Sequence, residues 1–70
     1  MIDEQLYRIC NYLNQYLLRN DGYLLRPDPA YLKAGISMLI EKEVLTKEEI
    51  KREALEDYSV IIPENLFPGG

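Results

Sequence analysis

The sequence contains no histidine and no tryptophan, and it contains a single cysteine, Cys10. Without histidine, the usual general base for a serine or cysteine nucleophile is missing. One thiol cannot form an intrachain disulfide, and alone it cannot build a tetrahedral zinc site. These absences argue against nucleophilic catalysis, and we expect the protein not to be an enzyme and to carry no cofactor.

Carboxylates are the remaining groups with catalytic or metal-binding chemistry. Glu49, Glu53 and Asp57 follow one another at four-residue spacing, so a helix places them near one face. Three such groups can chelate a divalent cation, but charged side chains at this spacing more often form a solvated surface. The sequence also lacks an EF-hand loop, a P-loop and a dinucleotide glycine motif. We therefore predict no catalytic, cofactor-binding or metal-binding residue.

Long apolar runs are also missing. The longest, such as 38–40 and 60–62, have three or four residues, whereas a membrane-spanning helix needs about 20. The N-terminus is acidic, while a signal peptide begins with basic residues and then turns apolar. We expect a protein that does not enter the membrane and that resides in the cytoplasm.

The charge balance argues against nucleic acid as a partner. The net charge is −4 and the pI is about 4.6, and the basic residues are interleaved with acids, whereas nucleic-acid binders carry a basic stripe. Two predicted helices joined by a tight turn suggest a helix-turn-helix DNA-binding regulator. However, the would-be recognition helix begins with Lys47 followed by Glu48 and Glu49, and two acids at that end would face phosphates. DNA binding is therefore the least favoured alternative.

The small size of the chain suggests a partner protein. With 47% hydrophobic residues the chain is expected to fold, but seventy residues bury only about 60% of their unfolded surface. Domains of this size often need a cross-link, a metal or association with another chain. Since the first two are missing, we expect association, either with another protein or with a second copy.

The pattern predicts a first helix from Ile2 to about Arg19, with Asp3 as its N-cap and Ile2 and Tyr7 as a hydrophobic staple. Gly22 is placed to end this helix in a left-handed conformation. The expected buried stripe consists of residues at helical spacing, Leu6, Ile9, Cys10, Leu13 and Leu17.

Two more helices follow. Asp28 and Pro29 predict the start of a helix that runs to about Glu43. This helix is apolar over most of its circumference, so we expect it to be central or to lie at an interface. Thr46 and Glu49 form a capping-box pattern that starts a third helix, from Lys47 to about Asp57, with Ile50, Ala54 and Tyr58 facing inward.

The fold class predicted is therefore mainly α: a compact three-helix domain over residues 1–58 with an extended C-terminal tail, residues 59–70. The tail contains the β-branched triplet Val60-Ile61-Ile62, which ends at Pro63. Residues 60–62 suit a minimal two-stranded pairing with 23–25, although such a ribbon is marginal unless it packs on helices. Docking of the tail on its own domain and contact with a partner both remain open.

The predicted function is a small non-catalytic protein–protein interaction module: an adaptor, an inhibitor or an assembly subunit of the kind common in phages and mobile elements. A self-associating structural subunit is the alternative. Six tyrosines are many for so small a core, and tyrosine suits a surface that is half buried against a partner. The residues predicted to contact the partner are large and apolar or aromatic: Tyr12, Tyr16, Tyr31, Met38, Leu66 and Phe67.

Overall fold

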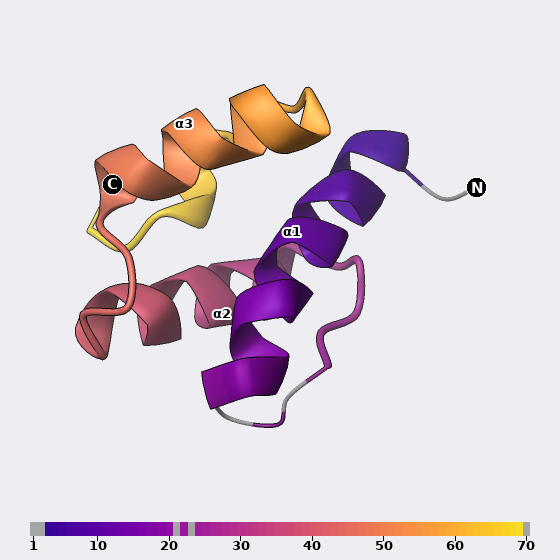
Figure 1. Ribbon diagram of the computed structural model, residues 1–70. Coiled ribbons are helices and arrows are strands. Elements are labelled where there is room, and N and C mark those ends of the chain that lie inside the picture. Colours follow the sequence, from indigo (N-terminus) through magenta and orange to yellow (C-terminus); the bar gives the residue numbers. More distant parts are fainter. Residues whose placement is uncertain (1–2, 21, 23, 70) are drawn as a thin grey trace.

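The described part of the chain forms three α-helices and one 3₁₀ turn, in the order α1 (Glu4–Asn20), α2 (Pro29–Glu41), α3 (Lys47–Tyr58) and η1 (Glu64–Leu66). The computed structural model describes residues 3–20, 22 and 24–69. Figure 1 shows the helices as one closely packed unit with the C-terminal tail folded back onto it. The prediction of a mainly α, three-helix domain is confirmed.

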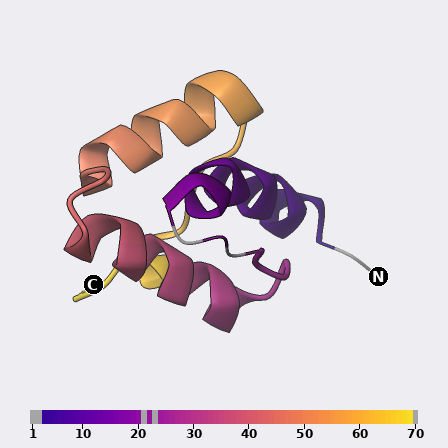
Figure 2. The same cartoon turned by 60° about the horizontal axis from the view of Figure 1, so that its bottom comes forward.

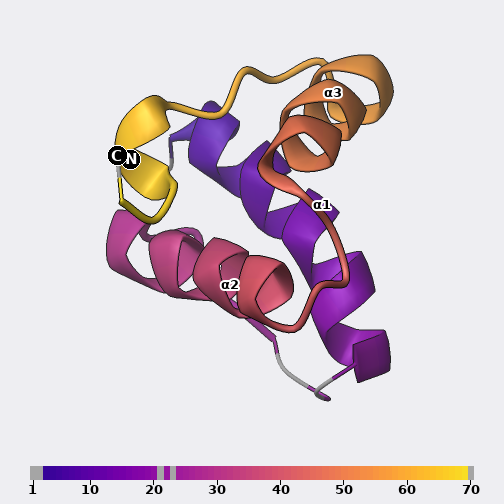
Figure 3. The same cartoon turned by 90° about the vertical axis from the view of Figure 1, so that its left-hand side faces the viewer.

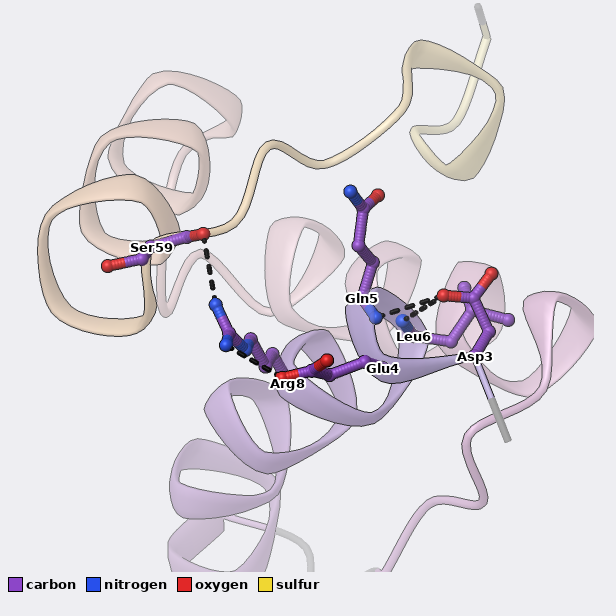
Figure 4. Close-up of polar contacts among 6 residues, drawn as sticks. All are labelled: Asp3, Glu4, Gln5, Leu6, Arg8 and Ser59. Carbon is purple, nitrogen blue, oxygen red and sulfur yellow. Dashed lines mark hydrogen bonds and ion pairs between the residues drawn. The ribbon is translucent and has the colours of Figure 1, made fainter. Parts of the chain in front are cut away.

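The start of α1 is fixed by Asp3, as predicted. The Asp3 Oδ1 atom accepts hydrogen bonds from the backbone N–H groups of Gln5, at 2.9 Å, and Leu6, at 3.4 Å (Figure 4). These groups would otherwise lack a partner, because the first turn of a helix has no preceding carbonyl groups. Ile2, one half of the predicted hydrophobic staple, lies outside the described residues.

The connection between α2 and α3 is tight because both helix ends are capped. α2 ends at Glu41, two residues earlier than predicted, because Glu43 adopts a left-handed backbone with φ 58°. The Val44 N–H then bonds back to the Leu39 carbonyl, at 3.0 Å, the pattern of a Schellman motif. α3 begins with the predicted capping box, in which Thr46 and Glu49 bond reciprocally.

Helix α1, and not α2, packs against both other helices. Figure 2 shows α1 with α3 on one side and α2 on the other. Five of its side chains are buried, including that of Tyr12. The expectation that α2 is central is therefore wrong: α2 packs on α1 and η1 and leaves Tyr31 and Ala34 on its outer side exposed.

The tail docks on its own domain. Val60, Ile62, Leu66 and Phe67 are each buried and join the core formed by the helices. Figure 3 shows the segment that leaves the end of α3 and reaches η1, which contacts α2. The tail is thus the fourth packing element of the domain.

The suggested β pairing is absent from the described residues, which contain no strand. Leu25 has other partners: its N–H donates to the Asn14 Oδ1 atom at 2.7 Å, and its carbonyl accepts from the Cys10 thiol at 3.1 Å. The Val60 N–H closes the end of α3 on the Ala54 carbonyl, at 3.2 Å. These groups are no longer available for a strand. Tyr23, the first residue of the proposed pairing, lies outside the described residues.

Candidate functional site

Three of the six predicted contact residues lie inside the domain. Tyr12 and Phe67 are 0% exposed and Leu66 is 3% exposed. In this fold they contact the chain itself, so they offer no surface to a partner. The expectation of an accessible Leu66–Phe67 anchor assumed a free tail, whereas η1 turns both side chains into the core.

The other three predicted contact residues keep contact with solvent. Tyr31 is 48% exposed, while Tyr16 and Met38 are half buried at the edge of the core. Tyr31 and Met38 share one side of α2 with the exposed Ala34, because these residues are spaced at three and four positions along the helix. We call this surface, consisting of Tyr31, Ala34 and Met38, the outer α2 face.

Glu53 joins α3 to α1 through two tyrosines. Its Oε1 atom accepts hydrogen bonds from the Tyr12 hydroxyl, at 2.9 Å, and from the Tyr16 hydroxyl, at 2.6 Å. The Tyr12 ring also meets the Tyr16 and Tyr58 rings edge-to-face, with centroids 5.6 Å and 5.5 Å apart. The cluster therefore supports the α1–α3 packing.

The pKa of each of the two hydroxyls is raised in this cluster. Burial, followed by the hydrogen bond to Glu53, raises the pKa of Tyr12 well above its usual range. The hydrogen bond to Glu53 is the main cause that raises the pKa of Tyr16 to about 12. Glu49, the neighbour of Glu53 in the acidic series, is engaged in the capping box. Two of the three acids considered for metal binding thus have structural partners, and the described residues contain no metal-binding group of three or more such side chains.

A shallow apolar groove lies between α3 and the tail. Leu55 is 52% exposed and Ile61 is 72% exposed, the most exposed of the large apolar side chains described. The groove has a volume of about 370 Å³. We call it the α3–tail groove, and its lining residues come from both segments: Lys51, Leu55, Ile61, Ile62, Pro63 and Glu64.

A clamp of opposite charges holds the tail beside the groove. The Glu64 carboxylate pairs with Lys47, at 2.9 Å, and with Lys51. The hydrogen bond from Lys47, followed by the one from Lys51, lowers the pKa of Glu64 to about 2. Hydrogen bonding to Glu64 raises the pKa of Lys51. Both ammonium groups also lie over the buried Phe67 ring, 5.2 Å and 5.6 Å from its centroid. The charges at this rim are therefore largely matched within the chain.

The end of α3 is tied to α1 beside the same segment. The Arg8 guanidinium pairs with Glu4 at 2.8 Å and reaches the Ser59 carbonyl at 3.5 Å (Figure 4). Ser59 itself takes a left-handed backbone with φ 53°, which turns the chain from α3 into the tail. This turn sets the direction in which residues 60–62 leave the helix.

Sequence reasoning missed Leu55 and Ile61 as surface residues. Leu55 lies beside the inward stripe of α3, which is formed by Ile50 and Ala54. Its position outside that stripe could have indicated that its side chain is exposed. Ile61 gave no such signal, because all three residues of the triplet 60–62 are β-branched and apolar. Only the fold shows that Val60 and Ile62 are buried while Ile61 points outward.

None of the helices described is both long enough and apolar enough to cross a membrane. Comparisons of the chain with protein families, with curated proteins and with solved structures find no significant match. The outer α2 face and the α3–tail groove are the two apolar surfaces on which a functional proposal is based.

Proposed function

We propose that this chain is a small non-catalytic protein–protein interaction module that acts in the cytoplasm as an adaptor, an inhibitor or an assembly subunit. The observation that carries the proposal is the apolar surface that stays exposed after the tail has folded onto the core. Tyr31, Leu55 and Ile61 are between 48% and 72% exposed. Contiguous exposed apolar side chains rimmed by polar ones are typical of interaction sites.

The chemistry of the two surfaces supports binding more than catalysis. The outer α2 face offers a tyrosine, a methionine and an alanine on a rigid helix, and tyrosine and methionine are enriched in interface cores. The α3–tail groove offers aliphatic side chains whose charged neighbours, Lys51 and Glu64, are already paired with each other.

A co-purification experiment tests the proposal. The tagged chain is expressed in its source cells as wild type, as Tyr31→Glu and as Ile61→Glu, with Leu24→Glu as control. Leu24 is 67% exposed and belongs to neither surface. We expect one protein to co-purify with the wild type and with the control at equal yield. We expect this protein to be absent when one of the two surface variants is used. If all four chains recover the same proteins, the proposal fails.

Self-association is separated from binding of another protein by measuring the mass of the purified chain. Light scattering over about a hundredfold range of concentration detects a dimer, and a dimer also makes the melting temperature depend on concentration. We expect a monomer throughout. A dimer that Tyr31→Glu or Ile61→Glu dissociates would favour the alternative, a self-associating structural subunit.

A further inference from the structure

The tail segment 60–62 shows the alternation of exposure that is typical of a strand. Exposure alternates along it, with Val60 2%, Ile61 72% and Ile62 3% exposed. This period of two is that of an extended chain, in which successive side chains point to opposite sides. The segment therefore buries two of its side chains in the core and turns the third, that of Ile61, toward solvent.

The main chain of Ile61 is available for pairing. Within the described part of the chain, no hydrogen bond involves its N–H or its carbonyl group. In an extended segment the N–H and C=O of one residue point to the same edge, where an antiparallel neighbour forms two bonds with them. Ile61 thus offers a donor and an acceptor together with an apolar side chain.

The available edge is short. On one side, the Ser59 N–H bonds to the Leu55 carbonyl and the Val60 N–H bonds to the Ala54 carbonyl. On the other side, Pro63 has no N–H to donate, so pairing ends there. An occupant therefore pairs with one central residue, Ile61, and its flanks extend past the edge.

Size decides between a peptide segment and a second copy of the chain. A stable dimer buries about 800 Å² per partner, from about 20–30 residues a side, whereas six residues line the α3–tail groove. The groove has a volume of about 370 Å³ and is open to solvent. The area therefore favours a short extended segment that inserts a side chain, and disfavours a globular face.

The rim of the groove indicates the side chain that fits. Leu55, Ile61, Ile62 and Pro63 provide apolar contact. The charged lining residues, Lys51 and Glu64, are paired with each other, so neither is left to recognise a charged group. An aliphatic side chain fits this lining, and its binding is expected to depend little on salt.

We propose that the α3–tail groove binds a short extended segment of a partner protein, which pairs its main chain with Ile61 and inserts an aliphatic side chain against Leu55 and Pro63. This inference rests on the proposed function and assigns a partner chemistry to one of its two surfaces. The mode of recognition is the addition of a strand, with backbone bonds giving affinity and one pocket giving specificity.

A peptide selection tests the inference. A phage library of random peptides of about nine residues is selected on the wild-type chain and counter-selected on Ile61→Glu. We expect enriched peptides with a central Leu, Ile, Val or Met, and synthetic copies that bind about tenfold more weakly to Leu55→Glu and Ile61→Glu. The control Leu24→Glu, and a change from about 50 to 500 mM salt, are expected to leave the affinity unchanged.

Backbone pairing is tested separately from the apolar contact. Ile61→Pro removes the N–H of this residue, and we expect it to weaken binding about tenfold, while Ile61→Val keeps that N–H and retains most of the affinity. Equal binding to both variants would overturn strand addition. Circular dichroism of each variant establishes that the domain remains folded.

The outcomes separate this inference from the proposed function. If peptides are enriched but lose affinity on Tyr31→Glu and not on Ile61→Glu, the assignment to the groove fails while an interaction module remains supported. If no peptide is enriched on the wild-type chain, the assignment fails, and the function is then judged by the co-purification experiment alone.

Discussion

Among the described residues, two that are not glycine adopt a left-handed backbone at the ends of helices. Glu43 closes α2 with φ 58° and Ser59 closes α3 with φ 53°. The left-handed conformation costs a residue with a Cβ atom roughly 1–2 kcal/mol, a cost that glycine does not pay. The sequence did not indicate either position, because neither residue is the glycine or asparagine that commonly marks such an end.

Glu43→Gly is therefore expected to stabilise the protein. The relief of strain exceeds the added entropy of the unfolded chain, so we expect the free energy of unfolding to rise by about 0.5–1 kcal/mol. The matched control is Glu56→Gly in α3, where the backbone is helical and the same substitution is expected to cost about 1 kcal/mol. Urea titration measures both, and equal effects at the two positions would contradict the argument.

Glu53 is the residue whose loss is expected to affect the tyrosine cluster most. Glu53→Ala removes the acceptor of two hydroxyls, one of them on the buried Tyr12. We expect a loss of about 1–3 kcal/mol. Glu56→Ala, also on α3 but exposed, is expected to change stability by less than about 0.5 kcal/mol. A loss of similar size in both variants would show that the cluster adds nothing specific.

The same tyrosine cluster leads us to expect that the stability of the protein depends on pH in the alkaline range. The pKa of Tyr16 is about 12 in the folded chain and about 10 when unfolded. The raised pKa makes a contribution to the free energy of unfolding that is fully present below about pH 10. This contribution is lost as the pH rises from about 10 to 12. Glu53→Gln weakens the cause of the shift, so its stability is expected to fall less over this window. Urea titrations at several pH values, with tyrosinate absorbance as the second measurement, check the difference.

At the level of elements, the starts of the helices were predictable from the sequence, whereas the packing between the helices was not. Asp3, Asp28 and Thr46 cap the helices that the sequence predicted, because capping depends on residues close in the chain. The buried Tyr12 donates its hydroxyl hydrogen bond to Glu53, which lies forty-one positions away in the sequence. Tyr12 lies at the flank of its helical stripe, so only the position of α3 decides whether it faces the core or a partner.

The close packing of Leu25, in the loop between α1 and α2, against α2 depends on Gly35. A Cβ atom at this position would lie 2.5 Å from Leu25 Cδ1 and 3.1 Å from Leu17 Cδ1. Helix propensity alone predicts a gain of about 1 kcal/mol for Gly35→Ala, but overpacking costs about 1–3 kcal/mol. The nearest atoms are the ends of the Leu25 and Leu17 side chains, which must shift within the core to admit a methyl group. We expect a net loss of about 1 kcal/mol in urea titration.

A double-mutant cycle identifies the cause. In a Leu25→Ala background the space above Gly35 is open, so Gly35→Ala is expected to be neutral or stabilising by up to about 1 kcal/mol. The same loss in both backgrounds would place the effect elsewhere than in the contact with Leu25.

At the scale of the whole molecule, the tail buries part of the apolar surface that a partner was expected to bury. The absence of a disulfide and a zinc site predicted that another chain would complete the core. Instead, Val60, Ile62, Leu66 and Phe67 complete it from within. The radius of gyration, 10.8 Å, is close to the roughly 11 Å of a compact chain of this length. The surfaces left for a partner to cover therefore include the outer α2 face and the α3–tail groove.

Phe67→Ala tests whether the tail is part of the cooperative unit. Deleting a fully buried phenylalanine costs about 3–5 kcal/mol, while the total stability at about 0.05–0.15 kcal/mol per residue is roughly 4–10 kcal/mol. We expect circular dichroism to show a much lower melting temperature for this variant than for the wild type. Ile61→Ala, in the same tail but exposed, is expected to melt within a few degrees of wild type. Similar melting of the two variants would show that the tail is energetically independent.

The position of Cys10 allows local opening to be timed. Cys10 is 4% exposed, and its thiol donates to the Leu25 carbonyl and accepts from the Asn14 side chain. Burial raises the pKa of this thiol. An aromatic disulfide reagent can attack only after residues 24–28 lift away or the whole domain unfolds. The rate of reaction of the thiol, measured at several urea concentrations, distinguishes local opening from global unfolding. A rate that changes little with urea indicates local opening of the loop, and a rate that rises steeply indicates global unfolding. The native chain thus carries its own kinetic reporter, without an engineered label.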